Sequence, residues 1–215
     1  MKTIFKILLA AFISISTIQS FSQAYTWQPL GSGLQNGTNG YVYAITSFNG
    51  NIIVAGSFTQ AGGVSAQNIA SYNPVTGVWT ALSTGINGEV KALTVRGSEL
   101  IAGGFFTQAG ITTVSNIAGW NGTNWLALGS GINDEVYALT VYNGDLIAGG
   151  SFSNAGGTGA NNIAKWNGTW SALGSGLTGS GDRVNALTVF AGNLVAGGRF
   201  TESGVTPMIN VAKWN

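Results

Sequence analysis

Short apolar runs separated by turn residues dominate the chain, and their spacing predicts β-structure. Within residues 136–173 the phrases VYALTV, LIAGGSF, NIAKW and WSAL follow one another. Runs of this length that are rich in Val, Leu and aromatic residues are typical of strands in a β-meander. Asn143-Gly144 and Asn167-Gly168 fit two-residue hairpin turns, because Asn and Gly tolerate positive φ at both central positions. No segment keeps a helical period, so the pattern predicts an all-β chain.

The four-strand unit occurs four times. An aromatic residue closes the second strand signal of each copy, at nearly equal intervals: Phe58, Phe106, Phe152 and Phe200. A four-stranded meander repeated about every 40–50 residues predicts a β-propeller of antiparallel blades. We place the repeats at residues 41–83, 89–132, 135–177 and 183–215.

Aromatic pairs join the third and fourth strand signals of the first three copies, and their regularity indicates blade packing: Tyr72 with Trp79, Trp120 with Trp125, and Trp166 with Trp170. The fourth copy supplies Trp214. Residues 26–33, TWQPLGSG, form a fourth-strand phrase with no third strand before it. We therefore expect residues 26–33 to complete the last blade and close four blades into a ring, which would hide two open sheet edges.

Two alternatives to this closed ring stay open. The chain could be a slice of a longer array. Two chains could also join head to tail into an eight-bladed ring, in which the N-terminal strand of each chain completes the last blade of the other. The expected state is therefore a monomer or a head-to-tail dimer.

The N-terminus has the pattern of a signal peptide. Lys2 and Lys6 precede an apolar stretch over residues 7–18, and Ser20-Phe21-Ser22 supplies the small-x-small pattern of a cleavage site. We expect a signal peptide over residues 1–22 and a propeller domain over residues 23–215, secreted or held at the cell surface, with no membrane span after cleavage. The alternative is an uncleaved anchor, for which the apolar stretch is short.

Composition narrows the classes of function. The formal net charge is +1, and 7% of the residues are charged, so there is no basic field for nucleic acid. The chain has no Cys and no His, which removes disulfides and the Ser-His and Cys-His catalytic pairs. We therefore predict no catalytic residues, no metal site and no cofactor.

The repeat phrases resemble a known family. An apolar run, Gly-Gly, a loop, an aromatic residue, a short turn and a tryptophan follow the pattern of kelch-type repeats, and residues 72–79, YNPVTGVW, look like the kelch hairpin between the third and fourth strands. The phrases AGG-x-F-T and W-x-A-L-G-S-G resemble the repeat arrays of secreted bacterial surface proteins. Those arrays often carry a C-terminal sorting domain, which is not recognised in these 215 residues. Kelch-like propellers usually have more than four blades and serve both as binding scaffolds and as enzyme domains.

Residues that directly precede or begin the first strand of each copy form one candidate ligand site: Tyr41, Glu89, Glu135 and Arg183. Four inner strands would bring these side chains to one channel mouth, where a cation or a small polar ligand could bind. The alternative is a solvated rim containing a Glu–Arg pair.

The variable connections supply a second candidate site. The links between second and third strands, and those between blades, fall on the same face of a propeller, and variable loops on a rigid scaffold often carry recognition. Matching positions in these links would form a polar ring: Gln60, Gln108, Asn154 and Glu202. We expect a binding scaffold for protein or glycan that acts through this long-loop face. The alternatives are a carbohydrate-active propeller enzyme domain and a structural spacer.

Overall fold

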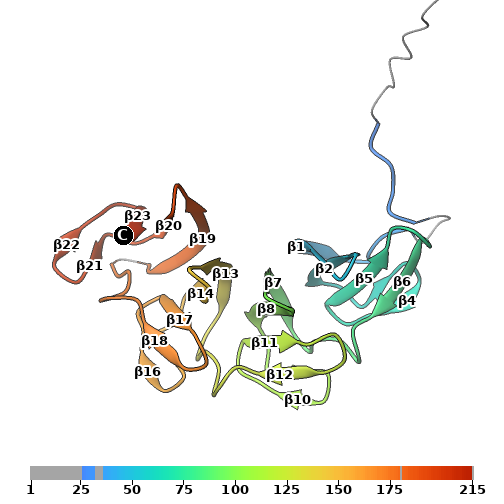
Figure 1. Ribbon diagram of the computed structural model, residues 1–215, viewed down its shortest axis with the longest axis horizontal. Helices are drawn as coiled ribbons and strands as arrows, with labels where there is room; N and C mark the ends of the chain where they lie inside the picture. Colours follow the sequence, from blue (N-terminus) through green and yellow to red (C-terminus); the bar gives the residue numbers. More distant parts are fainter. Residues whose placement is uncertain (1–25, 32–35, 180, 215) are drawn as a thin grey trace, which may run out of the picture.

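Four antiparallel sheets follow one another along the chain, as the repeat predicts (Figure 1). The computed structural model describes residues 26–31, 36–179 and 181–214. The first blade comprises β1 (Tyr41–Phe48), β2 (Asn51–Ser57), β5 (Ile69–Asn73) and β6 (Val78–Ala81). The second comprises β7 (Glu89–Arg96), β8 (Glu99–Phe105), β11 (Ile117–Trp120) and β12 (Trp125–Ala127). The third comprises β13 (Val136–Tyr142), β14 (Asp145–Gly150), β17 (Ile163–Trp166) and β18 (Trp170–Ala172).

The fourth blade has three strands among the described residues: β19 (Arg183–Phe190), β20 (Asn193–Arg199) and β23 (Val211–Trp214). A short hairpin leaves each blade between its second and third strands. These hairpins are β3 (Gln60–Ala61) with β4 (Val64–Ser65), β9 (Gln108–Ala109) with β10 (Thr112–Thr113), β15 (Asn154–Ala155) with β16 (Thr158–Gly159), and β21 (Glu202–Ser203) with β22 (Thr206–Pro207). The prediction of an all-β propeller built from four repeated units is confirmed.

The inner strands β1, β7, β13 and β19 pack against one another in that order. Each inner strand carries a β-bulge at the same point of its pairing, where the register shifts between the repeated Val and the Ala two residues later. The residues at the bulges are Tyr43, Lys91, Tyr137 and Asn185. A bulge bends a strand and re-aims a side chain, so every blade presents this one position differently from its neighbours in the strand.

Close backbone approach between the second and third blades, and between the third and fourth, requires glycine, whereas Ala55 takes this position in the first blade. A Cβ atom on Gly103 would lie 2.6 Å from Cγ1 of Val136 in the next blade, and one on Gly149 would lie 2.5 Å from Cγ1 of Val184. Real Cβ atoms do not approach this closely, and both valines are fully buried. The valine of the following inner strand therefore fills the space that a side chain would take at the glycine of the second strand. We call this glycine position the glycine seat.

A repeated asparagine joins each blade to the segment that enters the next one. Asn116 has a left-handed backbone (φ 61°), accepts a hydrogen bond from the Phe106 N–H at 3.0 Å, and donates one to the Ile132 carbonyl at 2.9 Å. Asn68 makes the same two bonds one blade earlier, to Phe58 and Ile86. Because an Asn side chain can both accept and donate, one residue satisfies two backbone groups from two different blades.

The aromatic pairs pack within the blades, as predicted. Their ring centroids are 5.1 Å apart for Tyr72 and Trp79 and 5.2 Å apart for Trp120 with Trp125 and for Trp166 with Trp170. The second tryptophan of each pair also reaches back to the preceding blade. Trp125 Nε1 donates to the Leu82 carbonyl at 3.4 Å, and Trp170 Nε1 donates to the Leu128 carbonyl at 2.7 Å.

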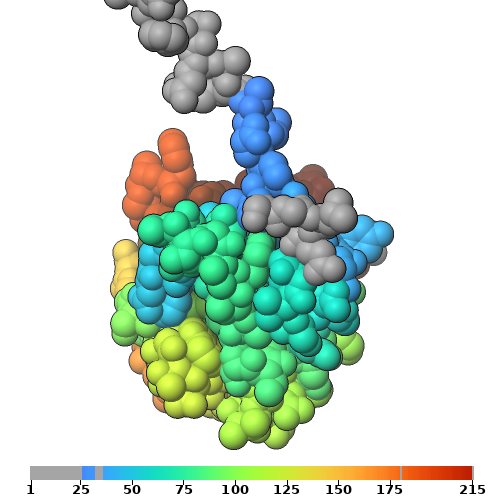
Figure 2. Space-filling model, turned by 90° about the vertical axis from the view of Figure 1, so that its right-hand side faces the viewer, coloured from blue at the N-terminus to red at the C-terminus, as the bar shows by residue number. Residues whose placement is uncertain are grey.

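The predicted pairing of residues 26–33 with the last blade is wrong for the part of this segment that the structure describes. Residues 26–31 form no strand, and they lie at the outer end of the first blade instead (Figures 1 and 2). Trp79 Nε1 donates to the Leu30 carbonyl at 3.4 Å, so Leu30 holds the place that Leu82 and Leu128 hold for the next two blades. The segment is thus attached through the contact between its Leu and the following blade, while Trp27 is fully exposed.

The predicted signal peptide, residues 1–22, lies outside the described residues. In the portion of the chain that the structure does describe, no helix has the length and apolar character needed to cross a membrane.

Candidate functional site

The bulges bring a group of charged and aromatic side chains together where the inner strands meet. We call this group the inner-strand cluster. It combines the four predicted residues with three of the bulge residues: Tyr41, Tyr43, Glu89, Lys91, Glu135, Tyr137 and Arg183. Each blade contributes at least one member, so the predicted convergence of the four inner strands accounts for the site.

Cations and aromatic rings alternate across the cluster. The Lys91 ammonium lies 5.6 Å from the ring centroid of Tyr43 and 5.5 Å from that of Tyr137. The Arg183 guanidinium lies 5.7 Å from the Tyr137 ring. Contacts of this kind contribute about 0.5–1 kcal/mol each at exposed sites. They link β1, β7, β13 and β19 into one row of side chains.

The two carboxylates of the cluster each have a partner. Glu89 forms an ion pair with Lys91 at 2.9 Å, and Glu135 accepts a hydrogen bond from the Tyr137 hydroxyl. The ion pairs of the described residues include no Glu–Arg contact in this cluster, so Lys91 takes the role that the sequence suggested for Arg183. Within the same described ranges, no three Asp, Glu, His or Cys side chains are grouped to hold a metal ion.

Electrostatics in the cluster follow from these contacts. Partial burial by itself would lower the pKa of Lys91, but the hydrogen bond with Glu89 and the negative charges of Glu135 and Glu89 raise that pKa above its ordinary value. Burial and the hydrogen bond to Glu135 raise the pKa of Tyr137 to about 12. Lys91 is therefore charged and Tyr137 is neutral over the whole physiological range.

The raised pKa of Tyr137 predicts a late step in an alkaline titration. Tyrosine in an unfolded chain ionises near pH 10, so between about pH 10 and pH 12 the folded state keeps a proton that the unfolded state loses. The stabilisation is complete below pH 10 and is lost as the pH rises through 12. Phenolate absorbance should show a late step from Tyr137, and Tyr137→Phe should remove that step. A late step that persists in the variant would contradict the assignment.

The second predicted set lies at the start of the short hairpins. Gln60 and Gln108 are exposed and Asn154 is half-buried. Their backbone N–H groups donate to the side-chain oxygens of Asn39, Asn87 and Asn133, each at 2.9 Å. The fourth member differs, because the Thr178 hydroxyl donates to the Glu202 carboxylate at 3.5 Å. The asparagine side chains hold the backbone at the start of each hairpin. The side chains of Gln60 and Gln108 have no part in this contact and are exposed.

Both predicted sets lie at the same end of the blades. The start of each inner strand pairs with the end of the second strand, as in Tyr41 opposite Ser57 and Glu89 opposite Phe105. Gln60 and Gln108 follow shortly after those partners in the chain. The inner-strand cluster therefore forms the centre of the long-loop face, and the hairpin residues lie farther along the same face.

Sequence reasoning missed Tyr43, Lys91 and Tyr137. Each occupies the variable position in the phrase V-x-A, within a stretch whose other positions hardly change between copies. The contrast between this variable position and its nearly constant neighbours is the sequence signal that would have identified these three residues. Regular alternation along a strand does not mark the position as special, whereas the bulge does.

Comparisons with known proteins agree with the fold. A family model described as the Rax2 C-terminal beta propeller domain matches residues 20–191. No curated protein matches the sequence. Among solved structures, the chain is similar to the computationally designed Ika4 protein, with 16% identity, 88% of this chain and 98% of that chain covered, and a TM-score of 0.57.

Two further solved structures are longer than this chain. The computationally designed Ika8 protein shares 16% identity over 87% of this chain and 49% of its own, with a TM-score of 0.53. U3-55K shares 15% identity over 80% of this chain and 48% of its own, with a TM-score of 0.51. The chain thus spans about half the length of these two structures, and identities this low show a shared fold alone.

Proposed function

The chain belongs to the family of the Rax2 C-terminal beta propeller domain, and from this premise we propose that it is a secreted or cell-surface binding scaffold. Its ligand is a glycan or a protein, held on the face that carries the inner-strand cluster and the hairpin residues Gln60, Gln108, Asn154 and Glu202. The export pattern of residues 1–22 and the kelch-like, bacterial style of the repeat support this location.

One observation carries the proposal: the bulge repeats in every blade, but the side chain at the bulge differs between successive blades, with Tyr at two of the four. The backbone pairing around Tyr43, Lys91, Tyr137 and Asn185 is the same in all four inner strands. A residue needed for blade packing would recur at each copy, as the valine beside it does. Diversity at one position of a fixed backbone is what a recognition surface on a rigid scaffold requires.

The chemistry of the cluster favours a glycan. Tyr41 and Tyr43 are both exposed, and their rings stack nearly parallel, with 6.4 Å between centroids and 11° between planes. Flat aromatic faces beside groups that donate and accept hydrogen bonds suit the mixed apolar and hydroxyl surface of a sugar. Lys91 and Arg183 supply charged donors, and Glu89 supplies acceptor oxygens. A glycan carrying an acidic group would also be attracted by the two cations.

The proposal includes no catalytic role. General acid–base chemistry works best with a side chain whose pKa lies near the working pH, and the pKa values of Lys91 and Tyr137 are both raised away from it. Glu89 is paired with Lys91, and Glu135 accepts a hydrogen bond from Tyr137. In the proposed site these partners keep both carboxylates occupied, and the carboxylates orient the cluster for binding.

A glycan array tests this proposal. We expect the purified chain to retain selected glycans, and Tyr43→Ala and Lys91→Ala each to weaken binding about tenfold, equivalent to about 1.4 kcal/mol. Gln108→Ala, farther along the same face, should have a smaller effect. Val75→Ala is the control, because Val75 is 91% exposed on the hairpin between β5 and β6. Retention of no glycan, or equal retention by wild type and Tyr43→Ala, would overturn the assignment.

A further inference from the structure

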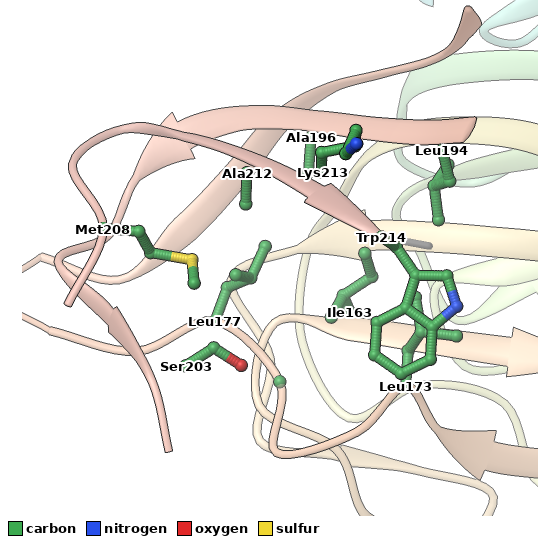
Figure 3. Close-up of a pocket in the computed structure, with 11 residues that line it drawn as sticks. Ile163, Leu173, Leu177, Leu194, Ala196, Ser203, Met208, Ala212, Lys213 and Trp214 are labelled. Atoms are coloured by element: carbon green, nitrogen blue, oxygen red, sulfur yellow. The ribbon is translucent and has the colours of Figure 1, made fainter. Parts of the chain in front are cut away.

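The fourth blade contains a socket that is filled by tryptophan in the blade before it. In the third blade, Trp170 packs into a buried cluster that includes Ile117, Leu128, Ile132 and Leu146. The repeat places Ile163, Leu173, Leu177 and Leu194 at the matching positions, and these residues surround a pocket (Figure 3). Trp214 lies beside this pocket, as Trp166 lies beside Trp170. We call this pocket the tryptophan socket.

A glycine repeated in each short hairpin indicates which side chain the tryptophan socket fits. In the third blade, a Cβ on Gly156 would lie 2.6 Å from Cβ of Trp170, so the hairpin must have glycine where the indole packs. Gly62 and Gly110 approach Trp79 and Trp125 in the same way. Gly204 keeps the left-handed backbone of this position, with φ +59°, but among the described residues other than its chain neighbours, only Ser175 has atoms within 4 Å of the added Cβ. The fourth hairpin therefore has the space for an indole, and none of the described tryptophans occupies it.

Residues 26–31 have the sequence pattern of the strand that would fill the tryptophan socket. Trp27 and Leu30 have the spacing of Trp170 and Leu173, and Leu30 already makes the contact with the following blade that Leu128 makes with Trp170. Pro29 suits this strand because proline is tolerated on an edge strand. Trp27 itself projects fully into solvent. We propose that Trp27 of a second copy of this chain inserts into the tryptophan socket, and that residues 26–31 of that copy pair with β23 as the fourth strand of the blade.

The arrangement of the blades selects a second copy over the chain's own N-terminus. The four blades form an open arc with the first and fourth at its two ends (Figure 1). Residues 26–31 lie on the outer side of the first blade, at the end of the arc remote from β23 (Figures 1 and 2). In a second arc placed head to tail, the N-terminal segment of each copy would meet the fourth blade of the other copy.

The inner strands provide an independent match. Val90, Val136 and Val184 are fully buried, whereas Val42 of the first blade is 39% exposed. Gly197 occupies the glycine seat of the fourth blade, and an added Cβ there would meet nothing closer than the Asn210 carbonyl oxygen at 3.9 Å. Val42 of the first blade therefore has no glycine of a preceding blade to pack against, and Gly197 of the fourth blade has no valine of a following blade packed against it.

Both matches are satisfied at once when two copies close into a ring. Each copy then supplies one tryptophan and one socket, so the ring has two identical seams. Head-to-tail contacts that close in this way give a finite assembly, while contacts that do not close give filaments. The inference does not depend on the proposed glycan site, because it concerns the ends of the arc.

A disulfide test identifies which chain completes the blade. By the register of Lys165 opposite Ser171 in the third blade, Gln28 of the inserted strand would face Lys213. Directly opposed residues of an antiparallel pair are close enough for a disulfide, and the chain has no cysteine of its own. Gln28→Cys with Lys213→Cys should give a covalent species of two chains on a non-reducing gel. Either single variant should form no such species at low concentration, which serves as the control.

Light scattering on the full chain supplies the second measurement. We expect twice the mass of one chain for the wild type and for Val75→Ala. Trp27→Ala and Gly197→Val should both give the mass of one chain while keeping a β-sheet circular dichroism spectrum. A disulfide within one chain, a single-chain mass for the wild type, a mass above two chains, or a doubled mass that survives Trp27→Ala would each overturn the proposal.

Discussion

Replacing Trp170 with alanine should lower the free energy of unfolding by about 3–5 kcal/mol, the usual cost of removing a large aromatic side chain from a core. Trp170 is 7% exposed, lies beside Trp166, and donates to the Leu128 carbonyl at 2.7 Å. The substitution leaves a cavity between two blades and removes one of the two hydrogen bonds that the Leu128 carbonyl accepts, the other coming from the Gly131 N–H. The cost should be large because rigid backbone on both sides, including Gly156, cannot collapse into the space.

Denaturant unfolding followed by circular dichroism measures this change without relying on tryptophan fluorescence. The control is Val75→Ala, which removes a highly exposed side chain. This control should change the stability by no more than about 0.5 kcal/mol, as surface substitutions usually do. A change for Trp170→Ala as small as that of the control would show that the pairing of tryptophans does not hold the blades together.

Asn116→Ala should be comparably destabilising. The change leaves the Phe106 N–H and the Ile132 carbonyl without their partner. Each buried unsatisfied group costs about 1–3 kcal/mol. Alanine must also adopt the left-handed backbone of Asn116, whose φ is 61°. A residue other than Gly or Asn pays about 1–2 kcal/mol for this conformation. The site joins two blades, so the loss should appear in global unfolding.

Matched variants separate the two causes. Asn116→Gly removes the strain and keeps the loss of hydrogen bonds, so it should be less destabilising than Asn116→Ala. Asn210 has the same backbone conformation (φ 62°) in the fourth blade, but it is exposed. In the Gly197→Val background, which we expect to be a single chain, Asn210→Ala should therefore cost only the backbone strain, about 1–2 kcal/mol. Equal effects at positions 116 and 210 in unfolding experiments would contradict the bridging role.

The repeated parts of the fold were predictable because each has a local cause. The Asn143-Gly144 turn, the short apolar strand signals and the aromatic pairs all report their structure within a few residues. The predicted two-residue turn at Asn167-Gly168 is wrong, because Trp166 pairs with Trp170 across a three-residue loop in which Gly168 but not Asn167 has positive φ. The position of residues 26–31 was not predictable in the same way. In the proposed ring this segment has two roles, one in the blade of the second copy that it completes and one against the first blade of its own chain. Its Leu contacts the following blade through Trp79, and the sequence does not say which chain provides the blade that its Trp completes.

The candidate site was predictable in part. Tyr41, Glu89, Glu135 and Arg183 stood out because they directly precede or begin the first strand of each copy, and the meeting of the inner strands brings them together. Lys91 and Tyr137 follow two residues later, and in a regular strand they would share a face with Glu89 and Glu135. The way these side chains interact depends on a bulge and on contacts between the inner strands of successive blades. Such contacts follow from the assembled blades and have no local signature.

The repeated bulge also separates two demands that usually compete within a strand. In the third blade, Val136 and Ala138 on either side of the bulge are buried in the core, whereas Tyr137 at the bulge is not part of the core. Chemical diversity can accumulate at four such positions while the stability of the blades stays nearly constant. Exchange of whole repeats would rearrange the four side chains without altering the backbone around them. The same property makes residues 43, 91, 137 and 185 a compact set for a combinatorial library in which new specificities are selected without rebuilding the scaffold.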